Sequence, residues 1–64
     1  MVNGEKIREL MKEKGISGKE LADKVGVSAA MISYIIKGFR EPNVAALARI
    51  AQTLDCTVDE LLVK

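Results

Sequence analysis

Signals that start and stop a helix recur along the whole 64-residue sequence and leave only short segments between them. Each segment opens with a residue whose side-chain oxygen can accept a hydrogen bond from the first helical turn, and three segments close at a glycine. The caps are Asn3, Ser17, Ser28, Asn43 and Thr57, and the closing glycines are Gly15, Gly26 and Gly38. The pattern predicts five short helices, without a linker or an internal repeat. We therefore expect one all-α domain over residues 1–64.

The apolar residues between these signals repeat at helical spacing. Ile7, Leu10 and Met11 fall on one face of the first segment, which predicts a helix over residues 4–14. The fourth segment, capped by Asn43, has the clearest period. Its apolar residues are Val44, Leu47, Ile50, Ala51 and Leu54.

The third segment is rich in β-branched residues between Met31 and Ile36, which is also compatible with a strand. Ile32 and Ile35 are three positions apart on either side of the polar Ser33, a spacing typical of a helix. We interpret the segment as a helix that follows the second one after a very tight turn.

Composition excludes several classes of function. The chain has one cysteine and no histidine, so an intramolecular disulfide is impossible and the usual zinc, di-iron and haem sites lack their ligands. Its apolar stretches are far shorter than the roughly 20 residues that cross a bilayer, and early charged residues argue against a secretory signal. A chain this short has little room for a catalytic cavity. We expect a cytoplasmic binding protein that is not an enzyme and has no cofactor, metal or small-molecule ligand.

The twenty residues from Gly18 onward read GKELADKVGVSAAMISYIIK. A small residue stands fifth (Ala22), a turn residue ninth (Gly26) and a branched apolar residue fifteenth (Ile32). This pattern resembles the helix-turn-helix of the lambda repressor and Cro (XRE-type) family of DNA-binding domains. The flanking segments extend the resemblance over about residues 5–62.

The resemblance implies a five-helix lambda repressor-like fold in which the second and third helices form the helix-turn-helix. In this family the third helix lies in the major groove of double-stranded DNA, and the N-terminus of the second helix lies near a phosphate. Carried over position by position, the DNA-contacting residues are Gly18, Lys19, Ser28, Ala29, Ala30, Ser33, Tyr34, Lys37 and Arg40.

The sequence departs from the family pattern at positions that bear on function. Family members often have glutamine in place of Gly18, so only the backbone amide remains there for a phosphate. Ala29 and Ala30 replace long polar side chains and offer a base edge only a methyl contact. Met11 and Ile36 stand where many members have an arginine and a glutamate that pair between helices, and we interpret them as an apolar packing solution.

The C-terminal end contains the expected dimer surface. Thr57 and Glu60 form a capping box, which predicts a short fifth helix. We expect this helix and the tail that follows it to provide a homodimer interface, with Leu61, Leu62 and Val63 as the contacting residues, because Val63 has no obvious place in a monomer core.

Three residues allow a second interpretation. Tyr34 either contacts DNA or is an ordinary amphipathic surface residue. For Phe39 there are three alternatives: it covers the core, joins a protein interface or touches the sugar–phosphate backbone. Cys56 stands at an apolar position of the family pattern, which favours a small buried hydrophobe over a redox-sensitive thiol.

These features lead to one main hypothesis and one alternative. The main hypothesis is a sequence-preferring transcriptional regulator, a small repressor of phage or mobile-element type that binds a two-fold operator as a homodimer. Residues 1–40, which include the motif, carry eight basic and five acidic side chains, whereas residues 41–64 carry two and four. The alternative is an antitoxin-like or regulatory protein-binding module, because Gly18, Ala29 and Ala30 weaken the DNA reader.

Overall fold

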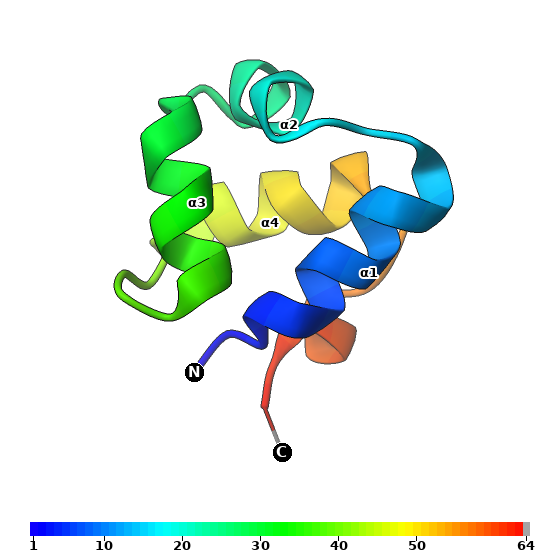
Figure 1. The fold of residues 1–64 in the computed structure, drawn as a ribbon. Coiled ribbons are helices and arrows are strands. Elements are labelled where there is room, and N and C mark those ends of the chain that lie inside the picture. Colours follow the sequence, from blue (N-terminus) through cyan, green and yellow to red (C-terminus); the bar gives the residue numbers. More distant parts are fainter. Residues whose placement is uncertain (64) are drawn as a thin grey trace.

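A computed structural model describes residues 1–63 of the chain. Figure 1 shows how the helices surround a common core, with the N-terminus close to the C-terminal segment. In chain order the elements are α1 (Gly4–Lys14), α2 (Gly18–Val25), α3 (Ala29–Lys37), α4 (Val44–Thr53) and the 3-10 turn η1 (Asp59–Leu61). α2 packs on both α3 and α4, and α1 packs on α3 and η1. The predicted all-α class is confirmed.

The predicted caps fix where the helices begin. Each of four caps accepts a hydrogen bond from the backbone amide three residues further on, at 2.7 to 3.2 Å. These caps are Asn3, Ser17, Ser28 and Asn43. A cap of this kind contributes about 1 kcal/mol to stability. Because the signals are local, the helix predicted over residues 4–14 has the bounds of α1.

The structure has four α-helices within residues 1–63 instead of the predicted five. The second capping box does form, since Thr57 N donates to Glu60 Oε2 at 3.2 Å and Glu60 N donates to Thr57 Oγ1 at 3.3 Å. Only the single turn η1 follows it. The chain is already extended at Leu62 (φ −96°, ψ 143°), which forms an antiparallel β-bridge with Val2.

This β-bridge explains why no fifth α-helix forms. Asn3 N donates to Leu61 O at 2.6 Å, and Val63 N donates to Met1 O at 2.9 Å. The two hydrogen bonds use backbone groups that a longer helix would have kept for itself. The fifth helix is therefore prevented by a tertiary contact, because the segment that pairs with residues 61–63 lies at the other end of the chain.

The core consists of aliphatic side chains from all the helices and η1, and no polar or charged residue is buried within residues 1–63. The largest fully buried side chains are Ile7, Leu21, Ile32, Ile35, Ile50, Leu54 and Leu61. Burying one such side chain contributes roughly 1.5–3 kcal/mol. Two of them come from α3, which confirms that its β-branched segment is a helix packed by one face.

α1 approaches α3 most closely at Gly4. A Cβ atom at this position would overlap the carbonyl oxygen of Ile36 in the last turn of α3. A backbone contact this tight requires glycine, since any side chain would push the two helices apart. The contact fixes the distance between the start of α1 and the end of α3.

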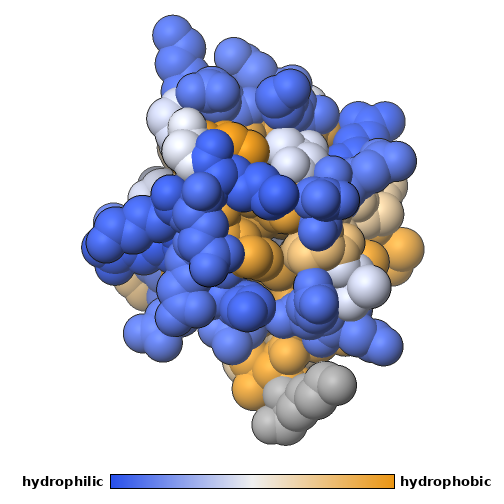
Figure 2. Space-filling model, turned by 90° about the vertical axis from the view of Figure 1, so that its right-hand side faces the viewer, coloured by the Kyte–Doolittle hydropathy of each residue, from blue (hydrophilic) through white to orange (hydrophobic). Residues whose placement is uncertain are grey.

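Figure 2 shows one face of the molecule, on which hydrophilic side chains predominate and apolar ones are visible between them and at the lower end. Within residues 1–63 none of the helices combines the length and the apolar character that crossing a membrane requires.

Candidate nucleic-acid interface

The turn between α2 and α3 holds the two helices at a fixed angle. Gly26 has φ +85°, a conformation that favours glycine, and its amide donates to Ala22 O at 2.8 Å. Arg49 of α4 donates from Nη1 to Val25 O at 3.3 Å, at the end of α2. Ala22 and Ile32 are buried where the two helices meet. The fifth, ninth and fifteenth positions of the motif thus have the small, turn and core roles that the sequence pattern predicts.

The outer face of α3 carries the predicted reader residues. Ser28, Ala29, Ala30 and Tyr34 are exposed, and Ser33 is half-buried. Because the core side of α3 is wholly apolar, the opposite side is available to a groove of DNA without any change in packing. The Ser28 hydroxyl oxygen accepts from Met31 N at 3.1 Å, so its hydrogen remains available for donation.

The N-terminus of α2 leaves two backbone amides without an acceptor inside the helix. Ser17 accepts from Glu20 N through its hydroxyl oxygen at 3.1 Å and from Leu21 N through its carbonyl at 3.0 Å. The amides of Gly18 and Lys19 precede these two and have no intrahelical acceptor. Together with the positive end of the helix dipole they favour an anion at this end.

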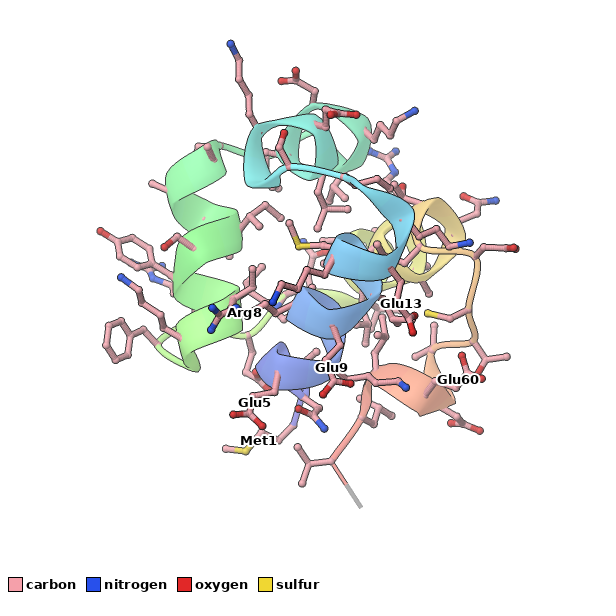
Figure 3. All side chains as sticks on the ribbon, turned by 45° about the vertical axis from the view of Figure 1, so that its right-hand side comes forward. Met1, Glu5, Arg8, Glu9, Glu13 and Glu60 are labelled. Atoms are coloured by element: carbon pink, nitrogen blue, oxygen red, sulfur yellow. The ribbon has the colours of Figure 1, made fainter. Side chains whose placement is uncertain are left out.

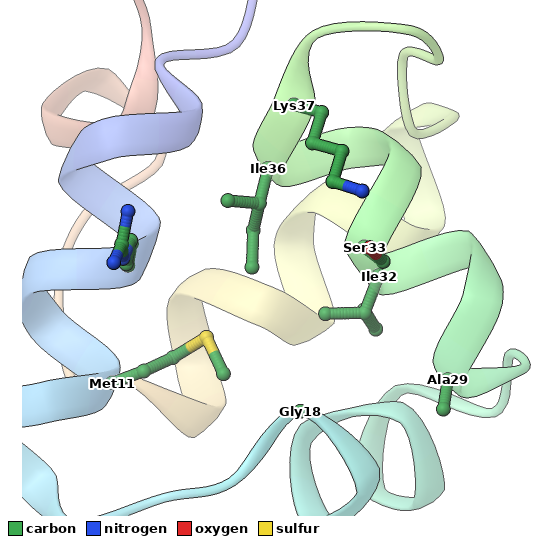
Figure 4. Close-up of a pocket in the computed structure, with 8 residues that line it drawn as sticks. Met11, Gly18, Ala29, Ile32, Ser33, Ile36 and Lys37 are labelled. Carbon is green, nitrogen blue, oxygen red and sulfur yellow. The ribbon is translucent and has the colours of Figure 1, made fainter.

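A groove between α1 and α3 brings several of the predicted residues together (Figure 4). It has a volume of about 370 Å³ and is lined by Arg8, Met11, Gly18, Ala29, Ile32, Ser33, Ile36 and Lys37. Four of the predicted DNA-contacting residues line this groove: Gly18, Ala29, Ser33 and Lys37. Figure 4 shows Met11 and Ile36 extending into the space between the helices. Both pack against the core, in agreement with the interpretation of an apolar pair.

The loop after α3 holds an exposed aromatic pair. The rings of Tyr34 and Phe39 have centroids 6.4 Å apart, and Phe39 N donates to Tyr34 O at 2.8 Å. Phe39 is 73% exposed, so the interpretation that it covers the core is wrong. The other two predictions for Phe39, a protein interface and a contact with the sugar–phosphate backbone, remain open. Arg40 N also donates to Tyr34 O, at 3.3 Å, which keeps this predicted contact beside the end of α3.

The three expected dimer residues differ in their surroundings. Leu61 is fully buried, so its side chain belongs to the core and is not available to a partner. Leu62 is half-buried in the β-bridge, whereas Val63 is 53% exposed. Cys56 packs against the core, and its burial, followed by the charge of Glu60, raises the pKa of its thiol. Cys56 thus packs on the core as a small apolar residue, but it is half-buried and not fully buried as expected.

Sequence reasoning missed three residues that shape this surface: Arg8, Gly4 and Arg49. Arg8 is three positions before Met11, and this spacing was a usable sign that both residues lie on the same face of α1. Gly4 and Arg49 act through contacts with distant parts of the chain, for which the sequence pattern gives no signal.

The model of the helix-turn-helix family matches residues 7–61. The chain belongs to this family. Among curated helix-turn-helix proteins, the transcriptional regulator AnsR of Bacillus subtilis is 36% identical over 61 residues, which are 95% of this chain and 53% of AnsR. The regulator SinR of the same organism is 37% identical over 60 residues, which are 92% of this chain and 54% of SinR. The chain thus spans about half the length of these two relatives.

Solved helix-turn-helix structures confirm the lambda repressor-like fold. A structure of SinR in complex with DNA matches with a TM-score of 0.84 and 37% identity, over 92% of this chain and 98% of that one. The DNA-binding domain of the P22 C2 repressor matches with a TM-score of 0.85 and 34% identity, over 92% of this chain and 78% of that one.

Proposed function

We propose that this chain is the DNA-binding domain of a transcriptional regulator and reads the major groove with α3. The observation that carries the proposal is the pairing of two features: an exposed outer face on α3, and two backbone amides at the N-terminus of α2 that have no acceptor inside the helix. Relatives named as transcriptional regulators, and the structure of SinR with DNA, support it.

One set of groups provides affinity by contacting phosphates, and another provides sequence preference by contacting bases. The amides of Gly18 and Lys19 hold one phosphate, and the cations of Lys37 and Arg40 attract the strand on either side. Base contacts come from Ser33 and Tyr34 hydroxyls and from the methyl groups of Ala29 and Ala30, which suit a thymine methyl. Because these direct contacts are few, the shape and deformability of the site supply further preference.

The regulator acts as a homodimer on a two-fold operator, with half-sites roughly 34 Å apart, and represses by occupying the site of the polymerase. A net charge of +1 gives one domain little electrostatic affinity for DNA, so two linked domains are needed for tight binding. The P22 C2 repressor is a structural precedent for the repressor role. The exposed Val63 is the candidate centre of the dimer surface.

The test is selection of binding sites from a random duplex library at two salt concentrations, followed by sequencing of the retained DNA. Enrichment of a palindrome, with affinity that falls steeply as salt rises, is the expected result. Retention without any enriched sequence would contradict the sequence preference. No retention at low salt would contradict DNA binding altogether.

A second candidate function is a regulatory protein-binding module. It is favoured by the small side chains Ala29 and Ala30 on the reader face and by the exposed Phe39. A structure of SinR with the SinI protein matches this chain with a TM-score of 0.87 and 35% identity. The variants Lys37→Ala and Arg40→Ala separate the two functions. If both leave DNA affinity and its salt dependence unchanged, the protein-binding function is favoured.

A further inference from the structure

We propose that Arg8, which lies on α1 outside the helix-turn-helix, binds a DNA phosphate, and that the groove between α1 and α3 seats the sugar–phosphate backbone of one strand. The inference rests on the proposed DNA-binding function. It adds a contact on an element that the motif does not include, and it gives a role to the apolar Met11 and Ile36, which line the groove.

The groove between α1 and α3 carries positive charge. Among residues 1–63, the charged residues that line it are Arg8 and Lys37, both positive, and no carboxylate lines it. Gly18, the first residue of α2, also lines it and brings the positive end of that helix to the same space. Two cations and a helix N-terminus around one groove attract a polyanion, and a phosphate chain passing along the groove meets all three.

The position of Arg8 also supports the inference. Figure 3 shows Arg8 extending from α1 toward α3, whereas Glu13 points to the opposite side of α1. Within residues 1–63 the side chain of Arg8 makes no hydrogen bond or ion pair in the structure. Glu5 and Glu9 line a neighbouring hollow with Arg8, but they are not part of the groove. The guanidinium is therefore free to bind a phosphate, for which its planar donors are well suited.

The apolar floor of the groove supports it as well. Met11 is buried, Ile36 is half-buried, and both extend into the groove between its two cationic sides. A deoxyribose ring presents carbon atoms between successive phosphates, so a strand can place its sugars on these side chains and its phosphates on Arg8 and Lys37. The groove is also continuous with the reader face, because Ala29 and Ser33 form part of its wall.

The test measures binding to an enriched duplex and to a scrambled duplex across a series of salt concentrations. For Arg8→Ala we expect the slope of log affinity against log salt to fall by about one unit, as for one lost phosphate contact. Affinity near 0.1 M salt falls about three- to tenfold, and by the same factor for both duplexes, because a phosphate contact does not read sequence. Arg8→Lys keeps the slope.

The matched control is Lys24→Ala, which removes one exposed cation from the last turn of α2, away from the groove. We expect its slope to stay close to that of the unaltered protein. A second variant, Ile36→Gln, makes the floor polar without adding charge and is expected to weaken binding while the slope is retained. Circular dichroism and thermal unfolding verify that each variant is folded.

The outcomes separate this inference from the proposed function. If the unaltered protein binds DNA and Arg8→Ala has the same slope and affinity, the inference is wrong and the proposed function stands. A loss of equal size in Lys24→Ala would also overturn it, because the effect would then follow net charge alone. If the unaltered protein binds no duplex at low salt, both fail together.

Discussion

Two glycines, each at the first position of a helix, have different structural roles. At Gly4 a Cβ atom would overlap the carbonyl oxygen of Ile36, whereas at Gly18 no atom lies within 4 Å of the place where a Cβ atom would stand. Gly4 is required by the packing of α1 on α3. Gly18 is not required by packing, and its small size matters only for what binds at the N-terminus of α2.

Substitution of Gly4 by alanine is expected to lower the free energy of unfolding by about 1–3 kcal/mol, because the helices must separate to admit the methyl group. Gly18→Ala is the matched control and is expected to be neutral or slightly stabilising. Urea unfolding of the two variants measures both effects. Equal stabilities would contradict the tight contact between α1 and α3.

Substitution of Gly18 by glutamine is expected to raise DNA affinity about fivefold, which corresponds to one added hydrogen bond to a phosphate worth about 1 kcal/mol. Stability should stay within about 0.5 kcal/mol, since the site is open. Titration of a labelled duplex measures the gain, and Gly18→Ala should lack it. A glutamine variant that binds no better than the alanine variant would argue against a phosphate at this helix end.

The contact between α1 and α3 uses apolar side chains where many relatives of this type use an ion pair. Met11 and Ile36 pack against the core from opposite helices. A buried pair of charges gains little over two hydrophobes of similar volume, because desolvation offsets the attraction. The apolar version therefore keeps the helices together without a buried ion pair.

A double-mutant cycle tests this contact. Met11→Arg and Ile36→Glu are each expected to lower the free energy of unfolding by about 1–3 kcal/mol, since each places an unpaired charge at a covered site. The double variant should recover part of the loss, with a coupling energy of about 0.5–3 kcal/mol. Chemical denaturation gives all four values. Strictly additive losses would show that the two positions do not interact.

At the element scale, the sequence predicted what depends on neighbours along the chain. Asn3 and Ser17 begin α1 and α2 as expected, because a cap bonds to an amide three residues away. The extended conformation of Leu62 was not predicted, because it depends on the pairing of this residue with Val2. Gly4 and Arg49 were missed for the same reason, since Gly4 contacts Ile36 and Arg49 contacts Val25, which are distant along the chain.

In the molecule as a whole, the proposed reader face lies on α3, while the expected dimer surface lies beside the β-bridge that joins the two ends of the described chain. Val63 is exposed there, whereas Leu61 is enclosed. The sequence predicted a surplus apolar residue in this tail, and Val63 is exposed as expected, but it could not separate the enclosed Leu61 from the exposed Val63. The hydrogen bonds of the β-bridge hold this segment so that the Leu61 side chain is buried and the Val63 side chain is exposed.

Val63→Asp is expected to weaken self-association at least tenfold while the fold is retained, because the side chain is exposed and the substitution buries no charge in the monomer. Sedimentation velocity over a concentration series measures the association. Gln52→Asp, an exposed change on α4, is the control. Unchanged self-association of the Val63 variant would place the interface elsewhere. Binding to a two-fold duplex should weaken only if self-association weakens.

Ala29 and Ala30 are exposed at the start of α3 and do not belong to the core. Substitutions at these two positions alter the exposed surface of α3 and leave the core contacts between the helices unchanged. At these two positions the exposed surface can vary independently of the stability of the domain. If α3 reads DNA as proposed, a library randomised at these two positions should yield folded proteins that prefer different DNA sites.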